Sequence, residues 1–258
     1  MTVAHVTGAA RGIGKAIATR LVADGHDVAV SDLPSMRDEL ETTARELADG
    51  AATRVVALTG DVSDPGSVRA LVADTVAELG SLDVMVANAG IAQTKALLDV
   101  TPEEYDAVHA VNGRGVFLCY TEAARQMIAQ GGGGKIIGAA SIAAHKGFAL
   151  LGVYCSSKFA VRSLTQSAAQ EWASHGITVN AYCPGIVDTT MWEEIDHDLG
   201  EINHVGKGES MQAMAAGIAL GRVSTGEDVA KLVSFLAGPD SDYMTGQSVL
   251  VDGGMVFS

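Results

Sequence analysis

The sequence predicts an α/β fold in which a doubly wound parallel sheet of seven strands carries helices on both faces. Three observations predict it. Short apolar, β-rich runs alternate with longer amphipathic segments along the chain. The run at 82–87 is almost wholly apolar, as expected for a parallel strand that is covered on both faces. No linker, composition shift or internal repeat marks a second unit, so we expect one domain over 1–258.

Composition and charge restrict the class of protein. Apolar residues make up 48% of the 258 residues and charged residues 19%, which is typical of a globular protein rather than a disordered one. The net charge of −14 disfavours nucleic acid and anionic membranes as partners. Three cysteines without metal-ligand spacing indicate reduced thiols. With no secretory signal and no apolar run of membrane length, we expect a cytoplasmic protein without a bound metal.

The first unit is a strand at 3–7, a glycine-rich loop, a helix at 15–24 and a strand at 27–31 that ends at Asp32. The loop glycines Gly8, Gly12 and Gly14 follow a G-x-x-x-G-x-G spacing, which differs from the common G-x-G-x-x-G. The physical demand is the same, because the backbone must turn tightly and approach a pyrophosphate at a helix N-terminus. This pattern predicts a Rossmann-like dinucleotide site. A glycine-rich turn without a ligand is the alternative.

Asp32 makes the dinucleotide interpretation more specific. An acid at the end of the second strand can accept hydrogen bonds from the adenosine ribose hydroxyls. Its negative charge would repel a 2′-phosphate, so the sequence favours NAD over NADP.

A helix is predicted over 35–49, a strand over 54–58 and a helix from the N-cap Asp64 to 79. Asp61 lies at the end of the predicted strand, where it could accept a hydrogen bond from an adenine amino group. A turn or capping aspartate explains that position equally well.

The apolar strand at 82–87 ends in the small residues Asn88-Ala89-Gly90, which let a ligand come close. Thr101 and Glu104 form a capping-box pattern that starts a helix running through Asn112 towards 130. The sequence Asn112-Gly113-Arg114-Gly115 breaks helix propensity in the middle of that segment. Such breaks occur at functional sites, and they also allow close helix packing. The sequence does not separate these two explanations.

A strand at 135–140 leads to Ser141, and a helix over 152–175 carries Tyr154 and Lys158. Residues four apart on a helix share one face. The lysine charge favours the phenolate, so we expect it to lower the tyrosine pKa from about 10 towards a useful range for a general acid or base. Ser141 adds a hydroxyl that can hold a carbonyl oxygen. Alone, a solvated helix face explains the Tyr-x-x-x-Lys spacing as well.

The rest of the chain supplies a strand at 177–182 that ends at Pro184-Gly185, a helix at 226–237 and a strand at 248–251. The stretch 188–217 lacks the strand and helix rhythm and contains several acids and glycines, so we expect a mobile lid there. In a doubly wound sheet, ligands bind outside the carboxyl ends of the strands. The glycine loop, Asp32, Asn88 and Ser141 all follow strand ends at that edge.

Over its whole length the chain resembles the short-chain dehydrogenase/reductase family. The motifs that carry the resemblance are Thr7-Gly8-Ala9-Ala10-Arg11-Gly12-Ile13-Gly14, Asp61-Val62, Asn88-Ala89-Gly90, Asn112, Ser141, Tyr154-x-x-x-Lys158 and Pro184-Gly185. Each motif is weak singly, but their order and spacing together are specific. Ala87 departs from the pattern, since the family usually has a second Asn there, and we expect little effect on the chemistry.

The resemblance implies an enzyme with a catalytic group of Asn112, Ser141, Tyr154 and Lys158. Tyr154 would be the general acid or base, Ser141 would bind the substrate oxygen, Lys158 would hold the nicotinamide ribose, and Asn112 would anchor a water in a proton relay. The implied NAD-binding residues are Gly8, Arg11, Gly12, Ile13, Gly14, Asp32, Leu33, Asp61, Val62, Asn88, Ala89, Gly90, Tyr154, Lys158, Pro184, Gly185, Ile186, Val187, Thr189 and Met191.

Within the family the chain is similar to the acetoin (diacetyl) reductases, also called 2,3-butanediol dehydrogenases. The segments that carry this similarity are 134–137, 157–162, 182–187 with Met191-Trp192, and 245–255. The apolar Ile142 and Phe148 resemble the (S)-specific type, and with Ser141, Tyr154 and Trp192 they would shape the substrate pocket. Core packing is the alternative role for Ile142, Phe148 and Trp192.

Other functions remain open. Within the family, a 3-oxoacyl carrier-protein reductase would need a basic rim, and the acidic 193–201 stretch argues against it. A sugar alcohol dehydrogenase would need a more polar pocket. A redox sensor that binds NAD without turnover would not need the Ser, Tyr and Lys that are all present. The resemblance also implies a homotetramer, with contacts around 105–130, 152–175 and the C-terminal strand.

Overall fold

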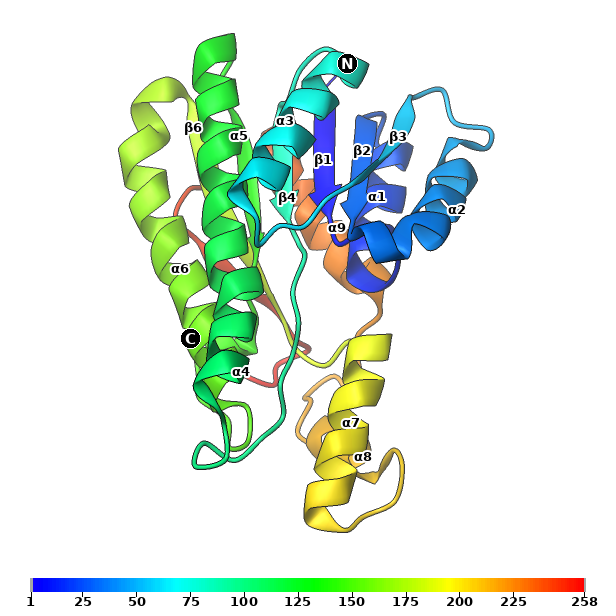
Figure 1. Ribbon diagram of the computed structural model, residues 1–258, viewed down its shortest axis with the longest axis vertical. Coiled ribbons are helices and arrows are strands. Elements are labelled where there is room, and N and C mark those ends of the chain that lie inside the picture. The colour runs from blue at the N-terminus through cyan, green and yellow to red at the C-terminus, as the bar shows by residue number, and fades with distance from the viewer. Residues whose placement is uncertain (1, 258) are drawn as a thin grey trace.

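The computed structural model describes residues 2–257 and has one parallel seven-stranded sheet in the order β3-β2-β1-β4-β5-β6-β7 (Figure 1). This confirms the predicted fold class. The order reverses between β1 and β4, which is the topological switch point where ligands bind in such sheets. The strands are β1 (Val3–Thr7), β2 (Asp27–Asp32), β3 (Val55–Thr59), β4 (Val84–Ala87), β5 (Gly134–Ala139), β6 (Ile177–Pro184) and β7 (Ser248–Val251).

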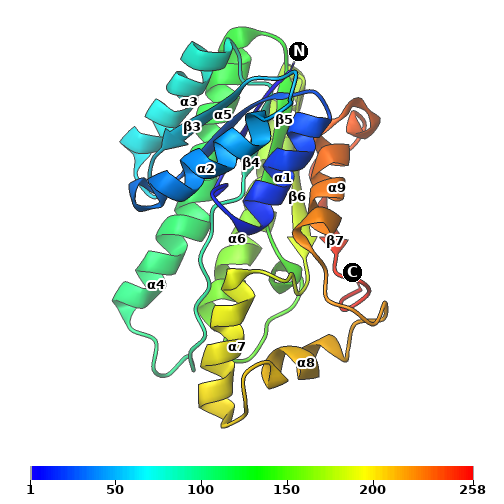
Figure 2. The same ribbon diagram turned by 90° about the vertical axis from the view of Figure 1, so that its right-hand side faces the viewer.

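Helices cover both faces of the sheet (Figures 1 and 2). One face carries α1 (Gly12–Ala23), α2 (Arg37–Ala48) and α9 (Gly226–Ala237). The other carries α3 (Pro65–Leu79), α5 (Val116–Gln130) and α6 (Gly152–Trp172). Two segments come directly before α5 in the chain, namely α4 (Pro102–His109) and a π-helical segment, η2 (Ala110–Gly115). Single 3₁₀ turns are η1 (Pro34–Met36), η3 (Ile142–Ala144), η4 (Ala173–His175) and η5 (Pro239–Ser241).

The strands contribute alternate side chains to the two cores, as the pleat of a strand requires. In β4, Val84 and Val86 pack towards α1 and α9, while Met85 and Ala87 pack towards α3 and α5. All four are buried, which explains why the sequence of this strand is continuously apolar rather than alternating.

Most element boundaries agree with the sequence predictions to within a few residues, and those of α9 and β7 agree in full. The capping box predicted at Thr101 is present, with reciprocal hydrogen bonds between Thr101 and Glu104. No helix among residues 2–257 is both long enough and apolar enough to cross a membrane.

The stretch 188–217, where the sequence shows no strand and helix rhythm, is helical in large part, and its mobility as a lid stays a prediction. This stretch forms α7 (Thr190–Asn203) and α8 (Glu209–Ala215), which project beyond the carboxyl edge of the sheet (Figures 1 and 2). Ile195 and Leu199 are buried and lie four residues apart on α7. The acids around these two residues make the apolar pattern hard to recognise in the sequence. A small helix at the side of a pocket buries few positions, so its apolar stripe is short.

A buried histidine links β1 to β2 and α3. His5 is fully buried, with its Nε2 2.8 Å from Ser31 Oγ and its Nδ1 2.8 Å from Thr75 Oγ1. Thr75 donates its own hydroxyl proton to Leu71 O, so it accepts from Nδ1–H of His5. Nε2 is therefore the acceptor for Ser31. The ring is neutral and fully paired, and burial lowers the pKa of His5 to about 4.

This histidine predicts an acid-sensitive fold. The folded state disfavours protonation of His5, whereas the unfolded chain binds that proton near pH 6.5, so stability is lost as the pH falls from 6.5 towards 4. In urea titrations at pH 7 and pH 4.5, His5→Gln should lose about 2 kcal/mol less unfolding free energy between the two pH values than wild type. An equal loss in the two proteins would contradict this assignment.

Candidate active site

Several of the predicted site residues follow the carboxyl ends of the strands. The glycine loop follows β1, Asp32 ends β2, Asp61 follows β3, Asn88 follows β4 and Ser141 follows β5. These positions lie on both sides of the switch point, and the end of β6 adds Pro184.

The glycine loop is built so that its backbone lies close to its neighbours. Gly8 has a φ of +64°, and a Cβ there would lie 2.8 Å from Ala89 Cα. A Cβ on Gly14 would lie 2.1 Å from Gly8 O, which no side chain can tolerate. The N-cap of α1, Arg11, gives no side-chain cap, and the first turn holds no acid. Backbone N–H groups at this helix end are thus available to a phosphate, which fits a dinucleotide.

Asn88 holds this loop in place. Its Nδ2 donates to Thr7 O at 2.8 Å and to Gly8 O at 3.0 Å, and its Oδ1 accepts from Tyr182 Oη at 2.7 Å. Both ends of the amide are therefore used within the protein. The predicted contact between Asn88 and a cofactor would fall to its backbone, while its side chain positions the glycine loop. The sequence does not indicate that Tyr182 binds Asn88, because Tyr182 lies in a strand with an ordinary apolar pattern.

Asp32 also supports the loop. One carboxylate oxygen accepts from Ala10 N at 3.0 Å and the other from Leu33 N at 2.8 Å. Each carboxylate oxygen has a second lone pair, so the group can still accept from a ribose hydroxyl. The structure thus places the acid where the sequence predicts it and gives it a second task.

Asp61 has the structure of a turn residue. Its Oδ1 accepts from both the backbone N and the Oγ of Ser63, each at 2.8 Å. This turn leads into α3. Neighbouring Val62 is buried, and a Cβ on Gly115 would lie 3.0 Å from its Cγ2. The observed contacts favour the turn role, and an adenine contact of Asp61 stays a prediction.

Tyr154, Lys158 and Ser141 lie together at the start of α6. Lys158 Nζ is 5.5 Å from the centroid of the Tyr154 ring and donates to Ala139 O at 2.8 Å. Lys158 is only 3% exposed, so this is not a solvated helix face. Ser141 is buried, and its Oγ accepts from Ala143 N at 3.1 Å.

The pKa of Tyr154 differs from the expectation. Burial raises it to about 12, and the neighbouring Ser141 hydroxyl only partly opposes this rise. Burial also lowers the pKa of Lys158 to about 8. The protein alone therefore keeps Tyr154 protonated at neutral pH. The sequence shows only the lysine charge beside Tyr154, whereas desolvation by the surrounding core has the larger effect on the tyrosine pKa.

Asn112 explains the break in helix propensity. It lies in the π-helical segment η2 and is fully buried. Its Oδ1 accepts from Ile91 N at 2.9 Å, and its Nδ2 donates to Ile91 O and to Ser157 Oγ. Single π-helical turns are rare and often mark functional sites. A Cβ on Gly90 would lie 3.2 Å from Asn112 Oδ1 and 3.4 Å from Lys158 Nζ, so this glycine keeps the space between them open.

A cavity of about 60 Å³ adjoins this group. That volume holds roughly four to six water-sized groups. All five predicted substrate residues line it, which are Ser141, Ile142, Phe148, Tyr154 and Trp192. Predicted cofactor residues also contribute, which are Ile13, Pro184, Gly185, Val187, Thr189 and Met191. The remaining lining residues, absent from the sequence predictions, are Ala143, Leu151, Ile195 and Met214.

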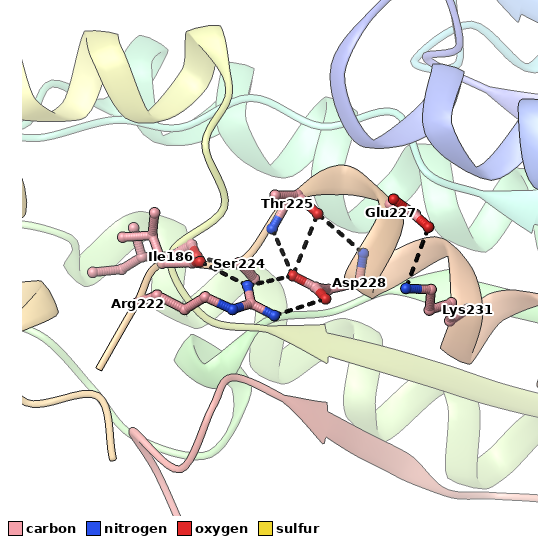
Figure 3. A network of polar contacts seen from close by, with 8 residues as sticks. Ile186, Arg222, Ser224, Thr225, Glu227, Asp228 and Lys231 are labelled. Carbon is pink, nitrogen blue, oxygen red and sulfur yellow. Dashed lines mark hydrogen bonds and ion pairs between the residues drawn. The ribbon is translucent and has the colours of Figure 1, made fainter. Parts of the chain in front are cut away.

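A polar network fixes the return of the chain from α8 to the sheet (Figure 3). Arg222 binds both carboxylate oxygens of Asp228, at 2.6 and 3.0 Å, and this contact lowers the pKa of Asp228. Asp228 closes a capping box with Thr225 at the start of α9. Ser224 donates from its N and Oγ to Ile186 O at 2.9 and 2.7 Å. The network thereby anchors the predicted cofactor segment around Ile186.

Known proteins agree with this arrangement. A family model described as enoyl-(acyl carrier protein) reductase matches residues 8–256. A short-chain dehydrogenase/reductase structure from Mycobacterium marinum superposes with a TM-score of 0.88 at 36% identity, covering 98% of this chain and 95% of that one. The chain belongs to the short-chain dehydrogenase/reductase family, and it is therefore an oxidoreductase of the alcohol dehydrogenase and carbonyl reductase type.

Two relatives lie closer in sequence. L-2,3-butanediol dehydrogenase of Corynebacterium glutamicum is 49% identical over 256 residues, which is 99% of each chain. A diacetyl reductase of Staphylococcus epidermidis, of the (S)-acetoin forming type, is 44% identical over 98% of each chain.

Proposed function

We propose that this protein transfers a hydride between NAD(H) and a small vicinal diketone, ketol or diol, such as diacetyl, acetoin or 2,3-butanediol. One observation carries the proposal. The cavity beside Tyr154 and Ser141 is small and lined mainly by apolar side chains. It therefore suits a short substrate whose oxygen lies beside the hydroxyl groups of these two residues. The names of the two closer relatives support the same substrate class.

The residues have separate tasks in this proposal. Ser141 Oγ holds the substrate oxygen, and Tyr154 donates its proton to that oxygen in carbonyl reduction or removes it in alcohol oxidation. The bound nicotinamide supplies or accepts the hydride. Lys158 stabilises the phenolate that Tyr154 becomes, because its cation lies against the ring.

The reprotonation of Tyr154 uses the space beside Gly90. Lys158 Nζ and Asn112 Oδ1 both border this space, and the nicotinamide ribose would bind on the open side of Lys158. A water held by Asn112 can pass a proton towards Lys158 there. Asn112 acts by position and does not itself carry the proton.

Asp32 would select NAD. Its carboxylate favours ribose hydroxyls and repels a 2′-phosphate. Because Asp32 also supports Ala10 N, replacing it with alanine would disturb the loop, whereas Asp32→Asn removes the charge and keeps a carbonyl acceptor. We expect Asp32→Asn to lower the ratio of kcat/KM for NADH over NADPH by about tenfold, since one charge contact is lost. An unchanged ratio would exclude Asp32 as the selector.

The direct test is the oxidation of NADH by purified protein with diacetyl. A 3-oxoacyl thioester with NADH, and a sugar alcohol with NAD⁺ in place of NADH, serve as the comparison substrates, and we expect diacetyl to have the highest kcat/KM. The exposed acids of α7, such as Glu193 and Glu194, disfavour an acidic carrier protein at the pocket rim. Turnover of the thioester alone would favour the carrier-protein function, and no turnover of any carbonyl would favour a sensor.

We further propose (S)-acetoin as the product, a homotetramer as the assembly and the cytoplasm as the location. Ile142 and Phe148 both line the cavity and support the first point. Tyr105, Phe117 and Phe159 are each at least 43% exposed on neighbouring helices, which fits burial between subunits. The three cysteines are free and buried, which fits a reducing compartment.

A further inference from the structure

The two helices α7 and α8, here called the α7–α8 hairpin (190–215), lie beyond the sheet (Figure 2). Both helices contribute side chains to the wall of the cavity. Met191, Trp192 and Ile195 line the cavity from α7, and Met214 lines it from α8. The wall contributed by α8 therefore depends on how this short helix is held against α7.

One side chain holds it. Asp196 follows the cavity residue Ile195 on α7 and is only 4% exposed. One of its carboxylate oxygens accepts from Gly208 N at 2.5 Å, and the other accepts from Met211 N at 2.8 Å. Asp196 thus reaches across the hairpin and binds two backbone N–H groups of the first turn of α8, those of the N-cap Gly208 and of Met211.

The helix α8 needs this contact. It has seven residues, and a helix of that length is not stable by itself. Its N-cap position is Gly208, which has a φ of +85° and no side chain to accept the first amide protons. Asp196 supplies from the neighbouring helix the acceptor that an N-cap side chain normally provides.

Stability alone does not explain the choice of an acid here. A buried carboxylate loses its hydration, and among residues 2–257 no Lys, Arg or His lies within ion-pair distance of Asp196. Its compensation comes from two directed amide hydrogen bonds. Such bonds fix the position and rotation of α8, which apolar packing would fix less sharply.

We propose that Asp196 is a positioning residue that sets the size limit of the substrate, because it holds Met214 as the outer wall of the pocket. This inference rests on the proposed function in one respect, namely that the cavity beside Tyr154 receives a small ketone or alcohol. Met214 is the specificity residue that contacts the substrate, and Asp196 acts through it.

Asp196→Ala removes both acceptors, and Asp196→Asn keeps one of them. Glu194→Gln is the matched control, because it removes an exposed charge from the same helix and Glu194 makes no ion pair with another described residue. Hydrogen exchange of the amides at 208–212 reports on the contact directly. We expect at least tenfold faster exchange in Asp196→Ala, a smaller increase in Asp196→Asn and wild-type exchange in the control.

The specificity is measured with vicinal diketones of increasing chain length. In Asp196→Ala we expect KM for the shortest diketone to rise about tenfold with kcat within about twofold, because the chemical group is intact. The longer diketones should gain in relative kcat/KM. Met214→Ala should shift the chain-length profile in the same way with unchanged amide exchange.

The double variant decides whether the two residues act together. Asp196→Ala combined with Met214→Ala should give the profile of either single variant rather than the sum of both shifts. An unchanged profile in Asp196→Ala, additive shifts or unchanged amide exchange would each overturn the inference. If Asp196→Ala does not fold, Asp196→Asn gives the same comparisons.

Failure of the proposed function has a different signature. If wild type reduces no diketone, the substrate assignment fails, and the chain-length series is then run on whichever ketone or alcohol it does convert. The exchange of the amides at 208–212 is measured without substrate, so it tests the contact between Asp196 and α8 whatever the substrate is.

Discussion

Tyr154→Phe should lower kcat for ketone reduction by about 10²-fold or more, since it removes the general acid and leaves the ring in place. The effect should appear in kcat because the proton is transferred in the chemical step. The affinity for NADH, measured by fluorescence titration, should change little. Burial raises the pKa of Tyr154 to about 12, so the group is protonated at neutral pH and carries the proton that carbonyl reduction needs.

Tyr243→Phe is the matched control. Tyr243 is fully exposed and does not line the cavity, so the same loss of a hydroxyl should leave kcat unchanged. If Tyr154→Phe keeps near-wild-type turnover, then Tyr154 is not the acid, and the two hydroxyls of the pocket would have to exchange their roles.

Gly14→Ala should remove NADH binding and destabilise the fold. The added methyl group would lie 2.1 Å from Gly8 O and 2.6 Å from Asn88 Nδ2, and both of these neighbours are fixed by hydrogen bonds. Overpacking of this kind costs about 1–3 kcal/mol. It would also move the backbone amides of the glycine loop. We expect the affinity for NADH to fall at least 100-fold, together with a lower thermal midpoint.

Gly132→Ala serves as its control, because a Cβ there has no heavy atom within 4 Å and the residue has no positive φ. That variant should bind NADH and unfold like wild type. Normal NADH affinity in Gly14→Ala would show that the glycine loop can relax, and NADH binding would then not depend on this glycine.

Local patterns in the sequence predicted the features that depend on spacing. The four-residue interval between Tyr154 and Lys158 predicted one helix face, and the two side chains do lie against each other. The break at Asn112 marked a real irregularity, which proved to be a π-helical segment. Glycines 8 and 14 are required by close approaches that their spacing already indicated.

Features that depend on tertiary neighbours could not be predicted. The pKa direction of Tyr154 follows from the packing around it, and the sequence shows only its charged neighbour. The side-chain oxygen of Asn88 accepts a hydrogen bond from Tyr182, which is distant in the chain and is brought close by the sheet. Met214 lines the cavity and Asp196 joins the two helices across a loop, and no spacing in the sequence indicates either contact.

In the proposed reaction, a hydride passes between NAD(H) and a small vicinal diketone beside Tyr154. The most direct measurement uses NADH deuterated at the transferable position of C4, with diacetyl as substrate, followed by chiral gas chromatography and mass spectrometry of the product. We predict (S)-acetoin carrying one deuterium at its carbinol carbon, formed by wild type and at least about 10²-fold more slowly by Tyr154→Phe. Acetoin without deuterium, or no acetoin at all while another carbonyl compound is reduced, would contradict the account.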